Sequence, residues 1–428
     1  MVTSLLSRRP SGHRRGADVT LPVDPGRAWL IAVAGLIANA ACWGTINSFG
    51  AFLDSMSDEF GAGLGATALI YALPSFVLFV LGMVTGPLAD QYGPRPMMLG
   101  GVALIASGLF VTSTASNLAV AVIAYGLGVG LGMACFLVPM AACIGGWFVR
   151  RRALAQGLSA SGAGLGTFLI VPLARWLIDE FGWRHAYQVL ALLCAGALVL
   201  AAAVAARPPQ RVPVGRPSLR RAREAAAAGP FAPVYIGALL MTASLFVPFV
   251  FLVRYATDHG IDAGAAALLL SVLGASNVAS RLVLTSLAGR VGAVRLYLMC
   301  FALLPVGLGL WLAAGDSYAI LAVFAAVLGV SHGGYVALSP EVAAELFGVA
   351  NLGTVLGALW TAAGVGGLLS PVLAGSLIDA AGYTVTIVAA LGFASLAVLA
   401  QRSLWTDAKP AGRPALLTAE PPAPVSAP

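Results

Sequence analysis

Long apolar runs separated by short polar stretches make up most of this chain of 428 residues. A helix needs about 20 mainly apolar residues to cross a bilayer, and it satisfies its own backbone hydrogen bonds there. Each run therefore predicts a transmembrane helix, and the expected fold class is an all-α polytopic membrane protein with twelve transmembrane helices. The expected helices cover residues 28–53, 66–89, 97–115, 117–146, 153–178, 184–206, 231–256, 264–288, 295–314, 317–340, 350–378 and 382–404.

Composition supports this prediction. Hydrophobic residues make up 59% of the chain and charged residues only 10%, whereas a soluble domain carries about 25% charged residues. The composition therefore excludes a soluble globular domain, and the lipid bilayer is the expected surrounding of the protein.

One polar stretch divides the chain into two halves. Residues 207–230 are basic and rich in proline and show no apolar periodicity. This linker predicts two six-helix bundles, over 28–206 and 231–404. The N-terminal tail, 1–27, has arginines but no apolar core typical of a signal peptide. The C-terminal tail, 405–428, is rich in alanine and proline and is expected to be disordered.

The positive charges predict the orientation in the membrane. Of the 24 Lys and Arg residues, 20 lie in the tails, the linker and alternate loops, all on one side of the expected helices. Only Arg175, Arg184 and Arg254 lie on the other side, and Arg281 lies inside. By the positive-inside rule, the protein is a multi-pass cell-membrane protein with both termini and the linker in the cytoplasm. The net charge of +7 follows from this topology, so no nucleic-acid partner is expected.

The sequence gives little support for a metal site, a disulfide, a nucleotide-binding loop or a catalytic site. The five cysteines all lie in apolar segments without a C-x-x-C spacing, which favours packing over metal binding or disulfide formation. No Walker-type phosphate loop occurs, and no nucleophile, base and oxyanion arrangement is visible. We therefore expect no cofactor, no metal site and no enzymatic activity.

The two halves resemble each other in sequence. The stretch SGAGLGTFLIVPLARWLIDEFGW in the first half aligns with AAGVGGLLSPVLAGSLIDAAGY in the second, so that Gly182 and Gly382 are 200 residues apart. The loops GPLADQYGPRP and TSLAGRVGAVR align with nearly the same offset, and Gly93 and Gly292 are 199 apart. This spacing predicts an internal repeat, which is typical of transporter folds.

The loop GPLADQYGPRP, which begins at Gly86, predicts a conformational role. Gly86 and Gly93 permit a tight cytoplasmic turn, and Asp90 can pair with Arg95 or cap a helix and so latch one conformation. Arg152, in the loop after the fourth segment, belongs to the same expected gating set. The alternative is an ordinary loop whose charges face water.

With these features, the chain resembles the major facilitator superfamily of transporters. GPLADQYGPR is similar to that superfamily's G-x-x-x-D-[RK]-x-G-[RK] signature, with Gln91 in place of a basic residue. The stretches WFVRRRALAQGLSASGAGLG, FGWRHAY, VRYATDHGI and ASNVASRL resemble the monocarboxylate transporter family and its bacterial relatives, including the oxalate/formate exchangers. The resemblance implies a functional monomer in which two bundles rock around a central site for a small monocarboxylate.

Arg281 is the main candidate for that site. A guanidinium at bilayer depth costs at least ~2.5–3.5 kcal/mol and keeps its charge, so it must meet a water-filled cavity or an anion. The resemblance implies that the arginine of this eighth helix binds the substrate carboxylate, for which its planar fork is suited. The alternative is a structural ion pair, but no Asp or Glu lies in the middle of any expected helix. The expected counter-ion is therefore the cargo.

Two positions depart from the family's pattern. Many animal members carry an aspartate four residues before this arginine, where it exchanges a proton, and a lysine in the first helix. Here these positions hold Asn277 and Asn47. Asn277 can hydrogen-bond the substrate or orient Arg281, but it cannot carry a proton. Proton symport and anion exchange therefore both stay open.

Four further residues complete the candidate site. His332, in the tenth segment, can titrate near neutral pH, although a histidine within the membrane can equally serve as a packing hydrogen-bonder. Tyr335 lies three residues further on, on nearly the same helix face, and can donate to a carboxylate. Asn39 and Tyr71 are expected to line the cavity from the first and second helices.

The predicted function is secondary active or facilitative transport of small, lactate- or pyruvate-like monocarboxylates, with protons as a further candidate partner. One rival is a drug or neutral-solute exporter of the same fold, in which Arg281 would be structural. The fourth and fifth segments lack the arginine and the G-P pair typical of drug antiporters. The other rival is a non-transporting ligand sensor.

Overall fold

The described part of the chain leaves out both tails and three connections. In this computed structural model it comprises residues 26–148, 151–206, 231–347 and 352–407. The linker expected over 207–230, nearly all of the tail expected over 1–27 and most of that over 405–428 lie outside the described residues.

Every element of these described ranges is a helix. The first half consists of α1 (Gly26–Asn47), α2 (Phe49–Phe60), α3 (Leu64–Thr67), α4 (Leu69–Tyr92), α5 (Pro94–Ser113), α6 (Leu118–Ile123), the π-helix η1 (Ala124–Val129), α7 (Gly130–Trp147) and α8 (Arg152–Val204). The second half consists of α10 (Phe231–Asp258), α11 (Ala263–Val291), α12 (Ala293–Ala314), α13 (Tyr318–Phe347), α14 (Leu352–Ala400) and α15 (Arg402–Asp407).

The described residues contain the twelve helical segments that the apolar pattern predicts. Ten helical stretches of the described residues are long and apolar enough to cross a membrane. Two of them, in α8 and α14, contain two expected segments each, because Gly182 and Gly382 take the non-helical φ values of 77° and 80°. The predicted loops at these two places are thus reduced to a kink at one glycine, a residue that tolerates positive φ.

The internal repeat is visible in the backbone and in its hydrogen bonds. Gly93 and Gly292, which separate α4 from α5 and α11 from α12, have φ values of 98° and 100°. Directly after the kinks of α8 and α14, Trp183 donates to Glu59 and the Tyr383 hydroxyl donates to Asp258. The two carboxylates are themselves 199 residues apart, so the two halves are built alike.

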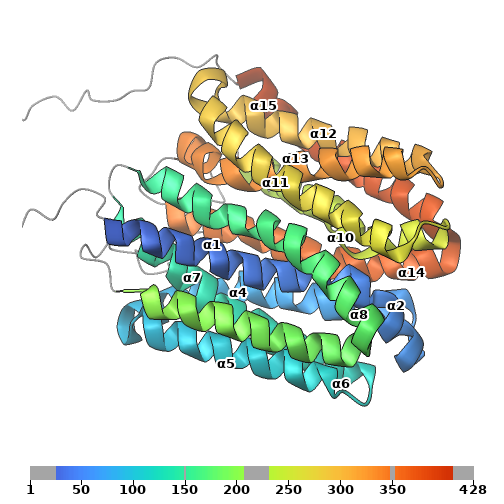
Figure 1. The fold of residues 1–428 in the computed structure, drawn as a ribbon. Helices are drawn as coiled ribbons and strands as arrows, with labels where there is room; N and C mark the ends of the chain where they lie inside the picture. The colour runs from blue at the N-terminus through green and yellow to red at the C-terminus, as the bar shows by residue number, and fades with distance from the viewer. Residues whose placement is uncertain (1–25, 149–150, 207–230, 348–351, 408–428) are drawn as a thin grey trace, which may run out of the picture.

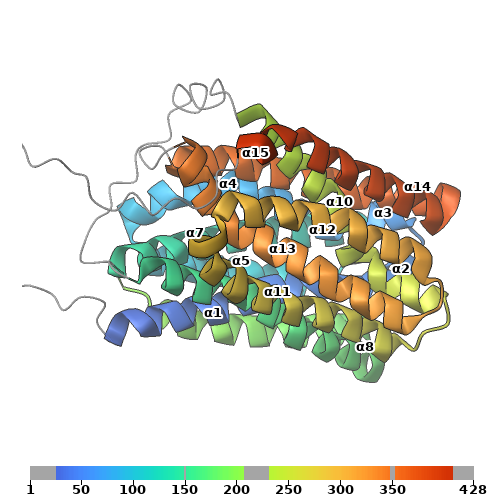
Figure 2. The same cartoon turned by 90° about the horizontal axis from the view of Figure 1, so that it is seen from above.

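The halves lie side by side with their long helices roughly parallel to one axis. In Figure 1 the blue-to-green helices lie below most of the yellow-to-red ones. Two edges join them, since α8 packs against α11 and α4 packs against α14, and both pairs are neighbours in Figure 2 as well. We call the end where α1 begins and α15 lies the terminal end, and the end where α2 and α10 finish the distal end.

One of these edges depends on two glycines. Gly164 of α8 and Gly274 of α11 face each other, and a Cβ on either would come within 2.6 Å of the other's carbonyl oxygen. Such close approach is typical of small residues at helix crossings in membranes. This glycine contact packs α8 of the first half against α11, one helical turn before Asn277.

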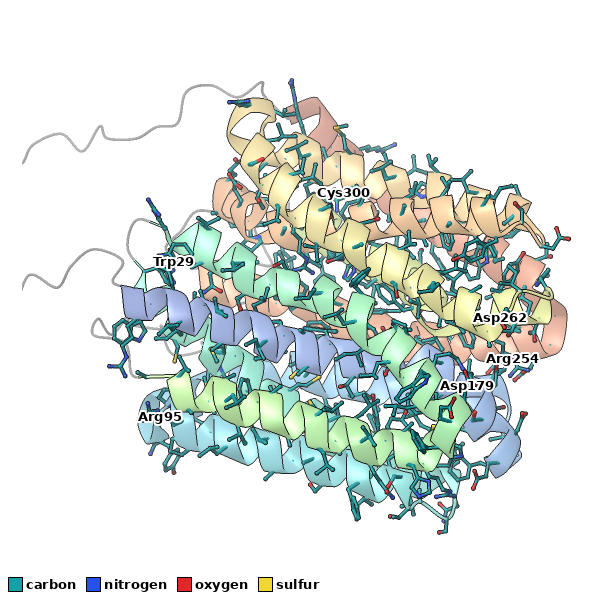
Figure 3. The ribbon with its side chains drawn as sticks, viewed as in Figure 1. Trp29, Arg95, Asp179, Arg254, Asp262 and Cys300 are labelled. Carbon is teal, nitrogen blue, oxygen red and sulfur yellow. The ribbon has the colours of Figure 1, made fainter. Side chains whose placement is uncertain are left out.

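Polar contacts join the halves at the distal end. Arg254 of α10 donates to Asp54 of α2 at 2.7 Å, and Asp379 of α14 accepts from the Leu64 amide of α3 at 2.8 Å. Figure 3 shows Arg254 at this end and Arg95 at the opposite one. The two halves are therefore held together on the distal side.

Candidate functional site

The middle of α11 carries the predicted anchor. Asn277 and Arg281 are four residues apart and hence one turn apart on one face of the helix. The Arg281 Nε donates to the Asn277 Oδ1 at 2.8 Å. Both residues are buried, with 2% of Asn277 and 4% of Arg281 exposed. The amide therefore holds the guanidinium from one side.

A neighbouring helix brings the histidine to this pair. Gly329 and Gly333 of α13 lie directly against α11, and a Cβ on Gly333 would come within 2.5 Å of the Asn277 carbonyl oxygen. This close packing places the Asn277 Nδ2 3.1 Å from the His332 Nδ1. The glycines on either side of His332 are thus what allows α11 and α13 to share a hydrogen bond.

Arg281 has no acidic partner in the described part of the chain. No Asp or Glu there lies within ion-pair distance of its guanidinium, and its Nη1 and Nη2 atoms have no hydrogen-bond partner among those residues. Val291, the terminal-end limit of α11, is ten residues away, or about 15 Å along the helix axis. The side chain is too short to span this distance, so the guanidinium does not reach the terminal end of α11.

Aromatic rings extend the site from α13 toward the first half. His332 meets Phe249 of α10 edge-on, with ring centroids 5.3 Å apart. Phe249 lies 6.3 Å from Phe246, and Phe246 lies 6.0 Å from Tyr71 of α4. The apolar wall beside the polar cluster therefore crosses from one half to the other.

Asn47 and Tyr71 form the first-half part of the site. The Asn47 Nδ2 donates to Thr167 Oγ1 at 2.8 Å, and the Tyr71 hydroxyl lies 3.5 Å from the Asn47 Oδ1. Thr167 also lies close to Gly274, beside the Asn277 turn of α11. Five of the seven predicted binding residues thus fall into two neighbouring groups. Arg281, Asn277 and His332 are joined by hydrogen bonds, and Asn47 and Tyr71 approach them through Thr167 and Phe246.

The sequence interpretation did not single out Thr167. Its pairing follows a regular spacing between α1 and α8, which the structure reveals and the sequence alone does not. Asn39 bonds to Ser159 and Asn47 bonds to Thr167, and each pair is 120 residues apart. The two helices therefore run parallel and in the same register at both pairs.

The other two predicted binding residues lie apart from this cluster. The Asn39 amide donates to the Gly35 carbonyl at 3.0 Å and to Ser159 at 3.2 Å, between α1 and α8. Tyr335 packs against Phe301 and Tyr297, and with Tyr297 it lines a separate small cavity of the second half. The roles of Asn39 and Tyr335 in substrate binding stay predictions.

The expected gating residues lie at the terminal end. Arg95 donates to the carbonyls of Ala205, at 2.5 Å, and Ala203, at 3.0 Å, and so holds the end of α8. The guanidinium of Arg152 lies over Gly145, and Gly86 faces Val138. Gly93 is the positive-φ turn described above. The Asp90 side chain lies outside the described residues, and a pairing with Arg95 stays a prediction.

Sequence comparisons identify the family. Residues 33–316 and 234–427 match the Major Facilitator Superfamily. The chain is 33% identical over 385 residues to rat Monocarboxylate transporter 3, covering 86% of this chain and 77% of that protein. This chain belongs to the monocarboxylate transporter family of that superfamily. It is therefore a multi-pass membrane transporter and not an enzyme, and the resemblance seen in its short motifs is confirmed.

Two further comparisons agree with this family assignment. Human Monocarboxylate transporter 11 is 32% identical over 378 residues, which cover 84% of this transporter and 79% of the human protein. Among solved structures, a mutant form of the nucleoside transporter NupG superposes with a TM-score of 0.72 over 89% of this transporter and 100% of NupG. At 12% sequence identity, that likeness concerns the fold alone.

Proposed function

We propose that this transporter carries small monocarboxylate anions, of the lactate and pyruvate kind, by alternating access, and that Arg281 binds the carboxylate. The proposal rests on the buried guanidinium of Arg281. Its hydrogen-bond partner among the described residues is the neutral amide of Asn277. A charge at this depth needs an anionic partner. The transported anion can supply it.

The geometry suits a carboxylate. With Nε bound to Asn277, the Nη1 and Nη2 groups remain to donate to a planar anion, and such charge-assisted bonds are stronger than neutral ones. Phe246 and Phe249 provide an apolar surface next to the cluster for a short organic tail. Polar groups that fix one end and apolar walls that hold the other are typical of small-molecule sites.

The position of the site between the halves supports alternating access. Asn47 and Tyr71 come from the first half and Arg281 comes from the second, so relative rotation of the halves would open the site to either side. The relatives named as monocarboxylate transporters support the substrate class. We further propose that the terminal end is cytoplasmic, that the protein resides in the cell membrane as a functional monomer, and that Arg95, Arg152 and the Gly86–Gly93 loop control the opening on that side.

Counterflow in proteoliposomes tests the proposal. Vesicles loaded with an unlabelled acid are diluted into the same radiolabelled acid, with L-lactate, pyruvate and benzoate as probes. We expect saturable uptake that Arg281→Gln reduces to background. Arg281→Lys should lose at least tenfold, because an ammonium cannot form the same planar pair of bonds. Arg290→Gln is the matched control, since Arg290 lies exposed on the same helix.

Two results would contradict the proposed function. Wild-type counterflow by Arg281→Gln would show that the guanidinium does not bind the substrate. Arg281-independent export of a cationic dye, together with no counterflow of any acid, would favour the drug-exporter alternative.

A further inference from the structure

We infer that Asp379 of the second half caps a helix of the first half that has no capping side chain of its own, and that this contact is a latch that closes the distal end. The contact is a hydrogen bond of 2.8 Å from the Leu64 amide to the Asp379 Oδ2. The latch rests on the alternating access of the proposed function, because opening of the distal end would have to break it. It does not depend on which substrate is carried.

The capped helix is the second membrane helix of the first half. α3 continues into α4 through Ala68, whose φ and ψ of −63° and −16° are helical, so Leu64 begins a long helix. The first amides of a helix have no partner within it, and they carry partial positive charge. The residue before them usually supplies a side-chain acceptor. Here that residue is Gly63, so these amides depend on a group from outside the helix.

The internal repeat shows what is missing at this position. Gly63 lies 199 residues before Asp262, which is the offset of the repeat. Asp262 is the N-cap of α11, and its Oδ2 accepts from the amides of Gly264 and Ala265 at 2.9 and 3.2 Å. The helix of the second half is therefore capped by its own aspartate, whereas the equivalent helix of the first half is capped by the opposite half.

The aspartates beside the two kinks differ in the same way. Asp379 of α14 and Asp179 of α8 are 200 residues apart and are equivalent in the repeat. Asp179 forms an ion pair with Arg175 on its own helix, and 52% of its side chain is exposed. Figure 3 shows Asp179 and Asp262 at the distal end. At the edge between α8 and α11, these two aspartates each bind within their own half, so the cap across the halves belongs to the edge between α3 and α14.

Close packing of α3 on α14 allows this hydrogen bond. A Cβ on Gly63 would lie 2.8 Å from the Asp379 Oδ2, so the carboxylate occupies the space that a side chain at position 63 would take. Beside it, a Cβ on Gly375 would lie 2.5 Å from the amide nitrogen of Gly65. A side chain at position 63 would therefore displace Asp379 from the helix.

The latch can open and close reversibly. Asp379 is exposed, so water reaches the contact. When α3 and α14 separate, the Leu64 amide and the carboxylate exchange their hydrogen bond for bonds to water, and the net free-energy change of such an exchange is small. The contact therefore favours the closed distal end without locking it.

Distances between spin labels test the latch in full-length protein in lipid nanodiscs without substrate. Labels at Ser116 and Asp316, both exposed in distal connections of the two halves, report the separation in a cysteine-free background. Asp379→Ala should raise the population open at the distal end by about fivefold, as expected for loss of one cap. Asp179→Ala is the matched control and should leave this population unchanged, because Asp179 pairs within α8.

A second variant separates a latch from a purely structural cap. Gly63→Asp in the Asp379→Ala background gives the first-half helix the cap that Asp262 gives α11. We expect the melting temperature to recover while the open population stays raised, because the new cap does not join the halves. Recovery of the closed distal end together with the melting temperature would overturn the latch, as would an unchanged open population in Asp379→Ala. Counterflow tests the proposed function separately: its absence for every acid would contradict that function, whereas the distances test the latch.

Discussion

Arg254 of α10 and Asp54 of α2 form an ion pair of 2.7 Å that joins the two halves at the distal end. Their side chains are 25% and 43% exposed, so the pair is partly screened by water. Exposed pairs contribute about 0.2–1 kcal/mol. We therefore expect Asp54→Asn to raise the population open at the distal end by up to about fivefold.

Distances between spin labels can measure this opening. Labels at Asp58 of α2 and Asp316 after α12, both exposed, report the separation of the halves in a cysteine-free background. The double variant Asp54→Asn/Arg254→Gln should open the distal end about as far as either single variant, because each removes the one ion pair that joins the halves here; the other partner of Arg254, Asp258, lies on its own helix. Arg175→Gln is the control, since its partner Asp179 lies on the same helix. Additive effects of the two substitutions would contradict a direct pair.

Gly333 provides a second prediction. A Cβ at this position would press against the Asn277 carbonyl, so Gly333→Ala should separate α13 from α11 and cost about 1–3 kcal/mol. We expect a lower melting temperature and at least a tenfold loss of counterflow. Gly289→Ala, on α11, has open space around its new methyl group and should be neutral or slightly stabilising. Equal melting temperatures for the two variants would contradict the close packing.

The Asn47–Thr167 hydrogen bond gives a third prediction. Both residues are buried, with 5% and 1% exposed. Thr167→Val removes the acceptor and leaves the Asn47 amide without it, which costs about 1–3 kcal/mol. Thermal unfolding in detergent measures the loss. Asn47→Leu/Tyr71→Phe/Thr167→Val should recover much of it, because the Tyr71 hydroxyl that faces Asn47 is then removed with the other two polar groups. A triple variant as unstable as Thr167→Val would contradict this explanation.

Features within one helix could be predicted well from the sequence. The spacing of Asn277 and Arg281 fixes them on one face of α11, and the apolar runs define the spans. The repeat identified Gly182 and Gly382 as equivalent, and both are kinks with positive φ. In each case the backbone period or the covalent chain carries the information.

Contacts between helices could not be predicted from the sequence in this way. The bond between Asn277 and His332 depends on how closely α11 and α13 pack, and Thr167 depends on the register of α1 with α8. The sequence pattern suggests Asp90 as a partner for Arg95, whereas the partners that the structure describes are the carbonyls at the end of α8. Such partners are set by tertiary packing, which a single sequence does not encode at fixed spacing.

Equilibrium binding is the measurement that tests the central claim most directly. Radiolabelled L-lactate, pyruvate and benzoate are bound to purified protein in detergent, and each is competed with its unlabelled acid and with the corresponding neutral amide. We predict displacement by the acid but not by a hundredfold excess of the amide, with affinity at least tenfold lower in Arg281→Gln and unchanged in Arg290→Gln. Equal affinity in wild type and Arg281→Gln, or equal displacement by the amide, would contradict carboxylate binding by Arg281.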